Sequence, residues 1–122
     1  MVEASRIAGI LGVRAASISD LSHKVEQGLP KQSLVRVARR VSTGKGEAGK
    51  LLVKVVPEAT FKRRVRLTPH ESERTERLAR VIAAAEYVWG DRNDAREWLH
   101  TPHPELDRKP PLQAALTELG AR

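Results

Sequence analysis

Residues 67–102 read LTPHESERTERLARVIAAAEYVWGDRNDAREWLHTP, and this stretch decides the fold. Thr68 can cap a helix with its hydroxyl, Pro69 suits the first helical position, and Glu71 completes a T-x-x-E capping box. Gly90 is suited to end the helix as a left-handed cap. The sequence therefore predicts one long helix between Pro69 and Gly90.

Apolar residues recur along this predicted helix with a period of 3.6. They are Leu78, Val81, Ile82, Ala85, Val88 and Trp89. This spacing predicts a single buried stripe. On the solvated side, Glu73–Arg77 and Glu76–Arg80 are acid-first pairs at i, i+4, and each adds about 0.2–0.5 kcal/mol.

A second helix is predicted to begin directly at Asp91 and to end before the prolines of the TPHP segment, because residues before proline disfavour the α conformation. Its apolar side carries Ala95, Trp98 and Leu99. The two helices should form an αα-hairpin in which Trp98 packs near Trp89 or Tyr87. A buried aromatic ring there would contribute a few kcal/mol.

Three segments then carry a resemblance: AxxVWGD at 85–91, WLHTPHPEL at 98–106 and PLQAALTELGAR at 111–122. Together with the capped helix, they resemble the toxin-binding domain of the Xre/MbcA/ParS antitoxins. The resemblance is close over 67–122 and looser upstream. It implies an all-α protein with an Xre-like helix-turn-helix DNA-binding region over 1–66 and a toxin-binding domain over 67–122.

The resemblance also implies a function. The chain would be the antitoxin of a type II toxin–antitoxin module, acting as a homodimer that neutralises a RES-domain, NAD-using toxin and represses its own operon. Family members usually continue into a terminal helix that approaches the toxin's active site, whereas this sequence stops at GAR, so the 67–122 domain is either complete or truncated at its C-terminus. The alternative is a small basic nucleic-acid-binding structural protein without a toxin partner.

Toxin contacts are expected outside the buried stripe, in the loop after the second helix and in the final segment. The candidates are His103, Glu105, Leu106, Lys109, Leu116, Leu119 and Arg122. Leu112, Leu116 and Leu119 could form an apolar edge for the partner, but packing against Trp98 within the domain explains the same spacing equally well.

The charge is unevenly divided. Residues 1–66 hold 14 lysines and arginines against 5 acidic residues, whereas residues 67–122 hold 8 against 10, within a net charge of +7. The first half is therefore a candidate for binding a polyanion. A solvated helix end near the C-terminal dipole is the alternative explanation for its basic run, but the further lysines and arginines in the same half favour a nucleic-acid-binding face.

A helix-turn-helix is predicted around the Val56–Pro57 break, because two short helices meet there and the second carries many cations. Phe61 and Val65 would be the buried side of the second helix. The DNA-binding candidates are Thr60, Lys62, Arg63, Arg64 and Arg66, with Lys50 and Lys54 from the helix before it. Gly49 lies inside that first helix and costs up to about 1 kcal/mol relative to alanine.

Upstream, we predict three more helices. The first lies within 2–11 and ends at Gly12, the second is capped by Ser17 or Ser19, and the third follows Leu29–Pro30. A turn-rich break at 42–46 separates them from the helix-turn-helix.

The sequence gives little support for a catalytic function or for a nucleotide or metal site. The GKGEAGKL segment at 44–51 approaches a nucleotide-binding loop, but Leu51 stands where a Ser or Thr must bind magnesium. His100 and His103 alone fall short of a metal site, and we find no catalytic constellation. The chain has no cysteine. We expect no enzyme, no cofactor, no membrane span and no signal peptide, and therefore a cytoplasmic protein.

Overall fold

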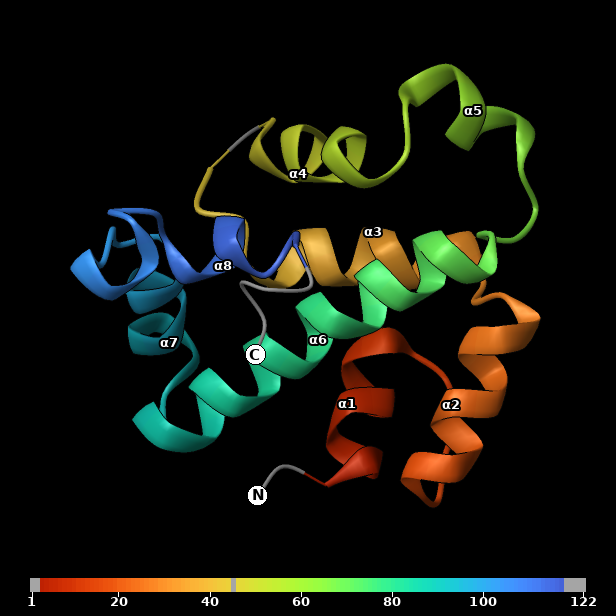
Figure 1. The fold of residues 1–122 in the computed structure, drawn as a ribbon, viewed down its shortest axis with the longest axis horizontal. Coiled ribbons are helices and arrows are strands. Elements are labelled where there is room, and N and C mark those ends of the chain that lie inside the picture. The colour runs from red at the N-terminus through yellow and green to blue at the C-terminus, as the bar shows by residue number, and fades with distance from the viewer. Residues whose placement is uncertain (1–2, 45, 118–122) are drawn as a thin grey trace.

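The computed structural model describes residues 3–44 and 46–117, which form helices joined by short connections, with no strand among them (Figure 1). The elements are α1 (Ala4–Leu11), α2 (Ile18–Gln27), α3 (Lys31–Arg40), α4 (Glu47–Val55), α5 (Glu58–Arg63), α6 (Pro69–Trp89), α7 (Arg92–Leu99), the 3-10 turn η1 (Pro104–Leu106) and α8 (Pro111–Ala114). The predicted all-α fold is confirmed. Within the described ranges, no helix combines the length and the apolar character that crossing a membrane requires.

Both ends of α6 follow the local sequence signals. The Thr68 hydroxyl accepts the Glu71 N–H at 3.1 Å, and the Glu71 carboxylate accepts the Thr68 N–H at 2.9 Å. At the other end, Gly90 has a φ of +69° and its N–H donates to the Glu86 carbonyl at 2.9 Å. The predicted capping box, proline start and left-handed end are all confirmed.

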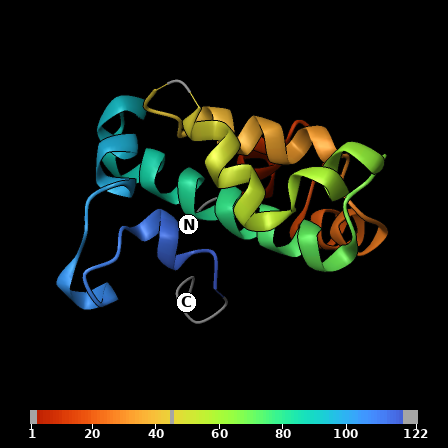
Figure 2. The same ribbon diagram turned by 90° about the horizontal axis from the view of Figure 1, so that it is seen from above.

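Helix α6 runs through the middle of the molecule and contacts α1, α2, α3 and α4 as well as α7 and α8 (Figures 1 and 2). Leu78 and Ile82 are fully buried on it. They belong to one aliphatic cluster that also holds Ile7, Leu34 and Val37 from α1 and α3. The two predicted regions therefore share one hydrophobic core, and α6 is its centre.

The predicted stripe on α6 is wrong in its last turn. Leu78, Ile82 and Ala85 are buried, but Val88 is 76% exposed and Trp89 is 48% exposed. Their angular position on the helix agrees with the pattern, but both side chains remain largely exposed to solvent. Burial on α6 therefore ends at Ala85, and an apolar surface remains exposed beyond it.

A bidentate ion pair joins α3 to α6. The Arg40 guanidinium donates through two nitrogens to the two carboxylate oxygens of Glu86, each at 2.8 Å. These hydrogen bonds raise the pKa of Arg40 above its usual range. Arg40 therefore stabilises the packing of two helices and does not add its charge to the basic surface.

A short backbone clasp, formed by residues 28–30 and 66–67, closes the chain around α3, α4 and α5. Leu67 donates its N–H to the Leu29 carbonyl at 2.9 Å, and Pro30 and Arg66 form an antiparallel bridge. Gly28 has a φ of +95°, and a Cβ on it would lie 2.5 Å from the Leu67 carbonyl oxygen. Only glycine fits this close approach.

Replacing Gly49 by alanine should raise the free energy of unfolding by up to about 1 kcal/mol. Gly49 lies inside α4, and a Cβ added there meets no atom within 4 Å. The gain should appear as a melting temperature a few degrees higher. Gly90→Ala is the matched control and should lower the melting temperature, because φ is +69° there. A Gly49→Ala variant that melts at or below wild type would contradict the helix geometry of α4.

Candidate functional site

The predicted helix-turn-helix corresponds to α4 and α5. Val56 between them is extended and fully buried, and Pro57 precedes the first turn of α5. Phe61 is half-buried against the core, with the Lys31 ammonium 4.9 Å from its ring centroid. The prediction that Val65 is buried is wrong, since it is 85% exposed. Helix α5 ends at Arg63 because the chain becomes extended there to reach the clasp.

The basic residues at α5 fall into two groups. Lys62 and Arg63 are exposed, and Lys62 forms only a surface ion pair with Glu58 at 3.2 Å. Such exposed pairs contribute at most about 1 kcal/mol, so they leave the cation available. Arg64 is ion-paired with Glu71 in the capping box of α6, and Arg66 donates to the Gly28 carbonyl at 2.9 Å. Thr60 is half-buried on the same helix.

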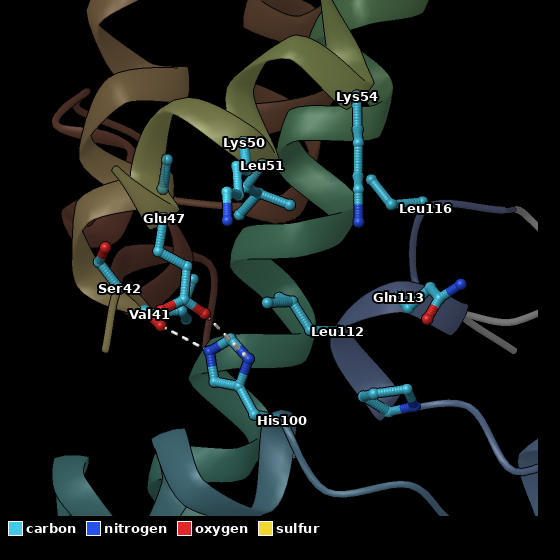
Figure 3. A pocket seen from close by; sticks show the side chains of 12 residues that line it. Val41, Ser42, Glu47, Lys50, Leu51, Lys54, His100, Leu112, Gln113 and Leu116 are labelled. Atoms are coloured by element: carbon cyan, nitrogen blue, oxygen red, sulfur yellow. Dashed lines mark hydrogen bonds and ion pairs between the residues drawn. The ribbon is translucent and has the colours of Figure 1, made fainter. Parts of the chain in front are cut away.

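Lys50 and Lys54 line a different feature, which we call the junction cleft (Figure 3). This cavity of about 330 Å³ lies between α4 and α8, with Leu112 and Leu116 on the α8 side. The structure thus brings two predicted DNA-binding lysines beside Leu116, a predicted toxin-binding residue. The cleft lies where the two predicted regions meet.

His100 crosses this junction and holds it together. Its Nε2 donates to the Val41 carbonyl at 2.7 Å, and its Nδ1 lies 3.6 Å from the Glu47 carboxylate (Figure 3). The residue after α7 is therefore bound to the turn between α3 and α4. The sequence carried no signal for this role, because the partners are more than 50 positions apart in the chain. No three potential metal ligands gather within the described part of the chain.

Glu47 lines the junction cleft, and its pKa lies below the usual range of a glutamate. The Thr43 hydroxyl, which donates to its carboxylate, lowers the pKa of Glu47 most, and burial opposes this. The Thr43 N–H and the charges of His100 and Lys50 lower it further. An ionised Glu47 therefore stabilises the turn that carries α4.

Glu47→Gln should lower the free energy of unfolding at pH 7, and the difference from wild type should disappear in acid. Because the folded-state pKa is lowered, the stabilisation is present above the unfolded value of about 4.3 and is lost as the pH falls through the folded value. Thermal unfolding of wild type and Glu47→Gln, measured from pH 7 to pH 2.5, shows whether the two melting temperatures become equal in acid. Glu26→Gln, an exposed change on α2, controls for net charge. A difference from wild type that stays constant with pH would contradict the role of Glu47.

The predicted toxin-binding loop is closed on itself. The His103 N–H donates to the Lys109 carbonyl at 3.2 Å, and the two residues form an antiparallel bridge. Asp107 and Arg108 both have left-handed backbones, with φ of 55° and 62°. Two adjacent non-glycine residues in this region store strain, which is typical of functional loops. The loop is thus held in one shape without regular secondary structure.

The predicted toxin-binding residues are not all in this loop. Glu105 and Lys109 are exposed on it, and His103 and Leu106 are half-buried. Leu116 lies at the junction cleft, and Leu112 beside it belongs to the core. Of the two explanations for the Leu112 spacing, the structure supports packing within the domain rather than an edge left free for the partner. Leu119 and Arg122 lie outside the described residues.

Two family models match the sequence. The antitoxin Xre-like helix-turn-helix domain matches residues 20–80, half of the chain, and the antitoxin Xre/MbcA/ParS C-terminal toxin-binding domain matches residues 84–122. The chain belongs to the Xre/MbcA/ParS antitoxin family. The resemblance predicted from the sequence is confirmed. Xre-family antitoxins are regulatory rather than catalytic, which confirms the expectation that this chain is not an enzyme.

Two curated proteins named Antitoxin Xre are similar to this Xre-family chain. One, from Pseudomonas putida, is 34% identical over 70 residues, covering 54% of this chain and 44% of the relative. The other, from Yersinia enterocolitica, is 42% identical over 57 residues, covering 46% of this chain and 38% of the relative. The chain spans less than half the length of the curated relatives it matches. The two family matches meet inside α6, and the division at residues 66 and 67 remains a prediction.

Proposed function

We propose that this chain is the antitoxin of a type II module, which neutralises a RES-domain, NAD-using toxin and represses its own operon by binding operator DNA. One observation carries the proposal: two regions share a single core. The first is a helix-turn-helix with exposed cations, and the second matches the toxin-binding domain. We further propose that it acts in the cytoplasm as a homodimer. A two-fold antitoxin would suit an operator with two half-sites.

DNA binding would use the outer face of α5. The second helix of a helix-turn-helix enters the major groove, and exposed cations neutralise phosphates. Lys62 and Arg63 are the leading candidates because both are exposed and weakly paired. Thr60, Arg64 and Arg66 would flank these two residues and contribute less to DNA binding, because Thr60 is half-buried and the two arginines are bound within the protein. Lys50 and Lys54, which line the junction cleft, would provide a second basic surface on α4.

Toxin binding would use the closed loop. Glu105 and Lys109 are exposed on a segment whose backbone is already fixed by the His103–Lys109 bridge. A loop held in one shape loses little entropy on docking. Leu106 and Leu116 would extend the proposed surface, and Leu119 and Arg122 are proposed as further contacts from their sequence alone. The C-terminal domain would be residues 67–122, with α6 shared by both functions.

The decisive experiment co-expresses the full chain with the toxin encoded beside its gene. Native mass spectrometry of the purified complex should show both proteins in a defined ratio, and the toxin's NAD turnover should fall on addition of the chain. Operator DNA from upstream of the gene pair should bind the chain or the complex. DNA binding without capture of the toxin would refute the antitoxin role and favour a basic nucleic-acid-binding structural protein.

A further inference from the structure

The two tryptophans of the chain line one hollow of about 240 Å³. Trp89 ends α6, and Trp98 lies near the end of α7. The other lining residues are Asp94, Glu97 and Thr101. We call this hollow the tryptophan notch. Trp89 is 48% exposed and Trp98 is half-buried, so both rings remain within reach of a partner.

The notch is a built feature of the hairpin between α6 and α7. Gly90 turns the chain sharply, and the i, i+3, i+4 spacing places Asp94, Glu97 and Trp98 on one face of α7. The Trp98 ring packs against the His103 ring, with centroids 5.3 Å apart. The Thr101 hydroxyl donates to the Glu97 carbonyl at 2.7 Å, which fixes the end of the helix.

The electrostatics of the notch are opposite to those of the whole chain. No lysine or arginine lines it, and within the described ranges neither carboxylate, of Asp94 or of Glu97, forms an ion pair. The faces of tryptophan rings attract cations, and nearby carboxylates strengthen that attraction. In a chain of net charge +7, this is a local site for a positive group.

We propose that the tryptophan notch receives an arginine side chain of the toxin. A planar guanidinium can stack on tryptophan and donate to a carboxylate at the same time, which an ammonium cannot do as well. The notch also lies beside the proposed toxin-binding loop, because Trp98, which lines it, contacts His103 of that loop. Exposed tryptophans and arginines are enriched among residues that dominate binding energy. The identity of the partner rests on the proposed function, whereas the preference for a guanidinium does not.

The first test uses tryptophan fluorescence, since both tryptophans of the chain line the notch. N-acetyl-argininamide should change the emission in a saturable manner, whereas the neutral N-acetyl-norleucinamide at equal concentration should not. Glu97→Gln should weaken the arginine response several-fold, and the matched change Glu26→Gln on α2 should leave it unchanged. Equal responses to the two probes, or an equal response in Glu97→Gln, would overturn the assignment.

The second test measures the affinity of the full chain for the toxin. Glu97→Gln should reduce it about tenfold, while Glu26→Gln and the circular dichroism of both variants stay at wild-type values. Unchanged affinity in Glu97→Gln would refute the notch as the toxin's site and leave the antitoxin role intact. Failure of the wild-type chain to capture the toxin would refute the antitoxin role, and the fluorescence titration would still decide whether the notch binds a guanidinium.

Discussion

Ile82→Ala is expected to lower the free energy of unfolding by about 2–5 kcal/mol. Ile82 is completely buried on α6, which contacts both the helices before it and the helices after it. Truncation removes apolar contacts and leaves a cavity that the surrounding helices cannot fully close. Since a domain of this size has only about 5–15 kcal/mol of stability, the loss is a large fraction of the total.

Chemical denaturation of the purified chain measures this loss, and Val88→Ala is its matched control. Val88→Ala also removes an apolar group from α6, but the Val88 side chain is 76% exposed. The free energy of unfolding of this variant should therefore stay within about 0.5 kcal/mol of wild type. DNA binding and toxin capture should fail over the same temperature range in Ile82→Ala. Equal effects of the two substitutions, or the loss of only one activity, would contradict a single shared core.

The double substitution Lys62→Ala and Arg63→Ala is expected to weaken operator binding about tenfold or more. It should also reduce the slope of log affinity against log salt by about one unit per lost phosphate contact. Both side chains are exposed on α5, and the only ion pair between them and a carboxylate in the described residues is the surface pair with Glu58. The fold should therefore survive the change, and toxin capture should persist.

Fluorescence anisotropy of labelled operator DNA over a salt series gives both quantities. The control is the double substitution Arg14→Ala and Arg92→Ala, which removes the same charge from exposed positions outside α5. An equal loss in the control would mean that net charge, rather than the face of α5, attracts the DNA. An unchanged salt slope in the α5 variant would place the DNA-binding face elsewhere.

The sequence was sufficient where the cause was local. The capping box at Thr68, the glycine end at Gly90 and the side-chain cap by Asp91, which begins α7, all involve residues within a few positions of one another. The i, i+4 pairs Glu73–Arg77 and Glu76–Arg80 also form, but the prediction that they lie on the solvated side is wrong for Arg77, which is 5% exposed. Each of these depends on helix geometry alone.

The errors arose where remote segments decide the outcome. Periodicity predicts on which face of α6 Val88 lies, but it does not predict how far along that face other segments pack. Val65 is exposed because the clasp draws the chain out of α5, and the clasp partner lies far upstream. For the same reason, the sequence did not reveal the Arg40–Glu86 pair or the contact between His100 and Val41.

The clasp has an evolutionary consequence. The pair α4–α5 is anchored before its start by the contact of His100 with Val41, and after its end by the bridge between Pro30 and Arg66. Substitutions on the outer face of α5 touch neither anchor. Under the proposed role of α5 in DNA binding, that face can therefore change its operator preference without disturbing the segments that hold it in place.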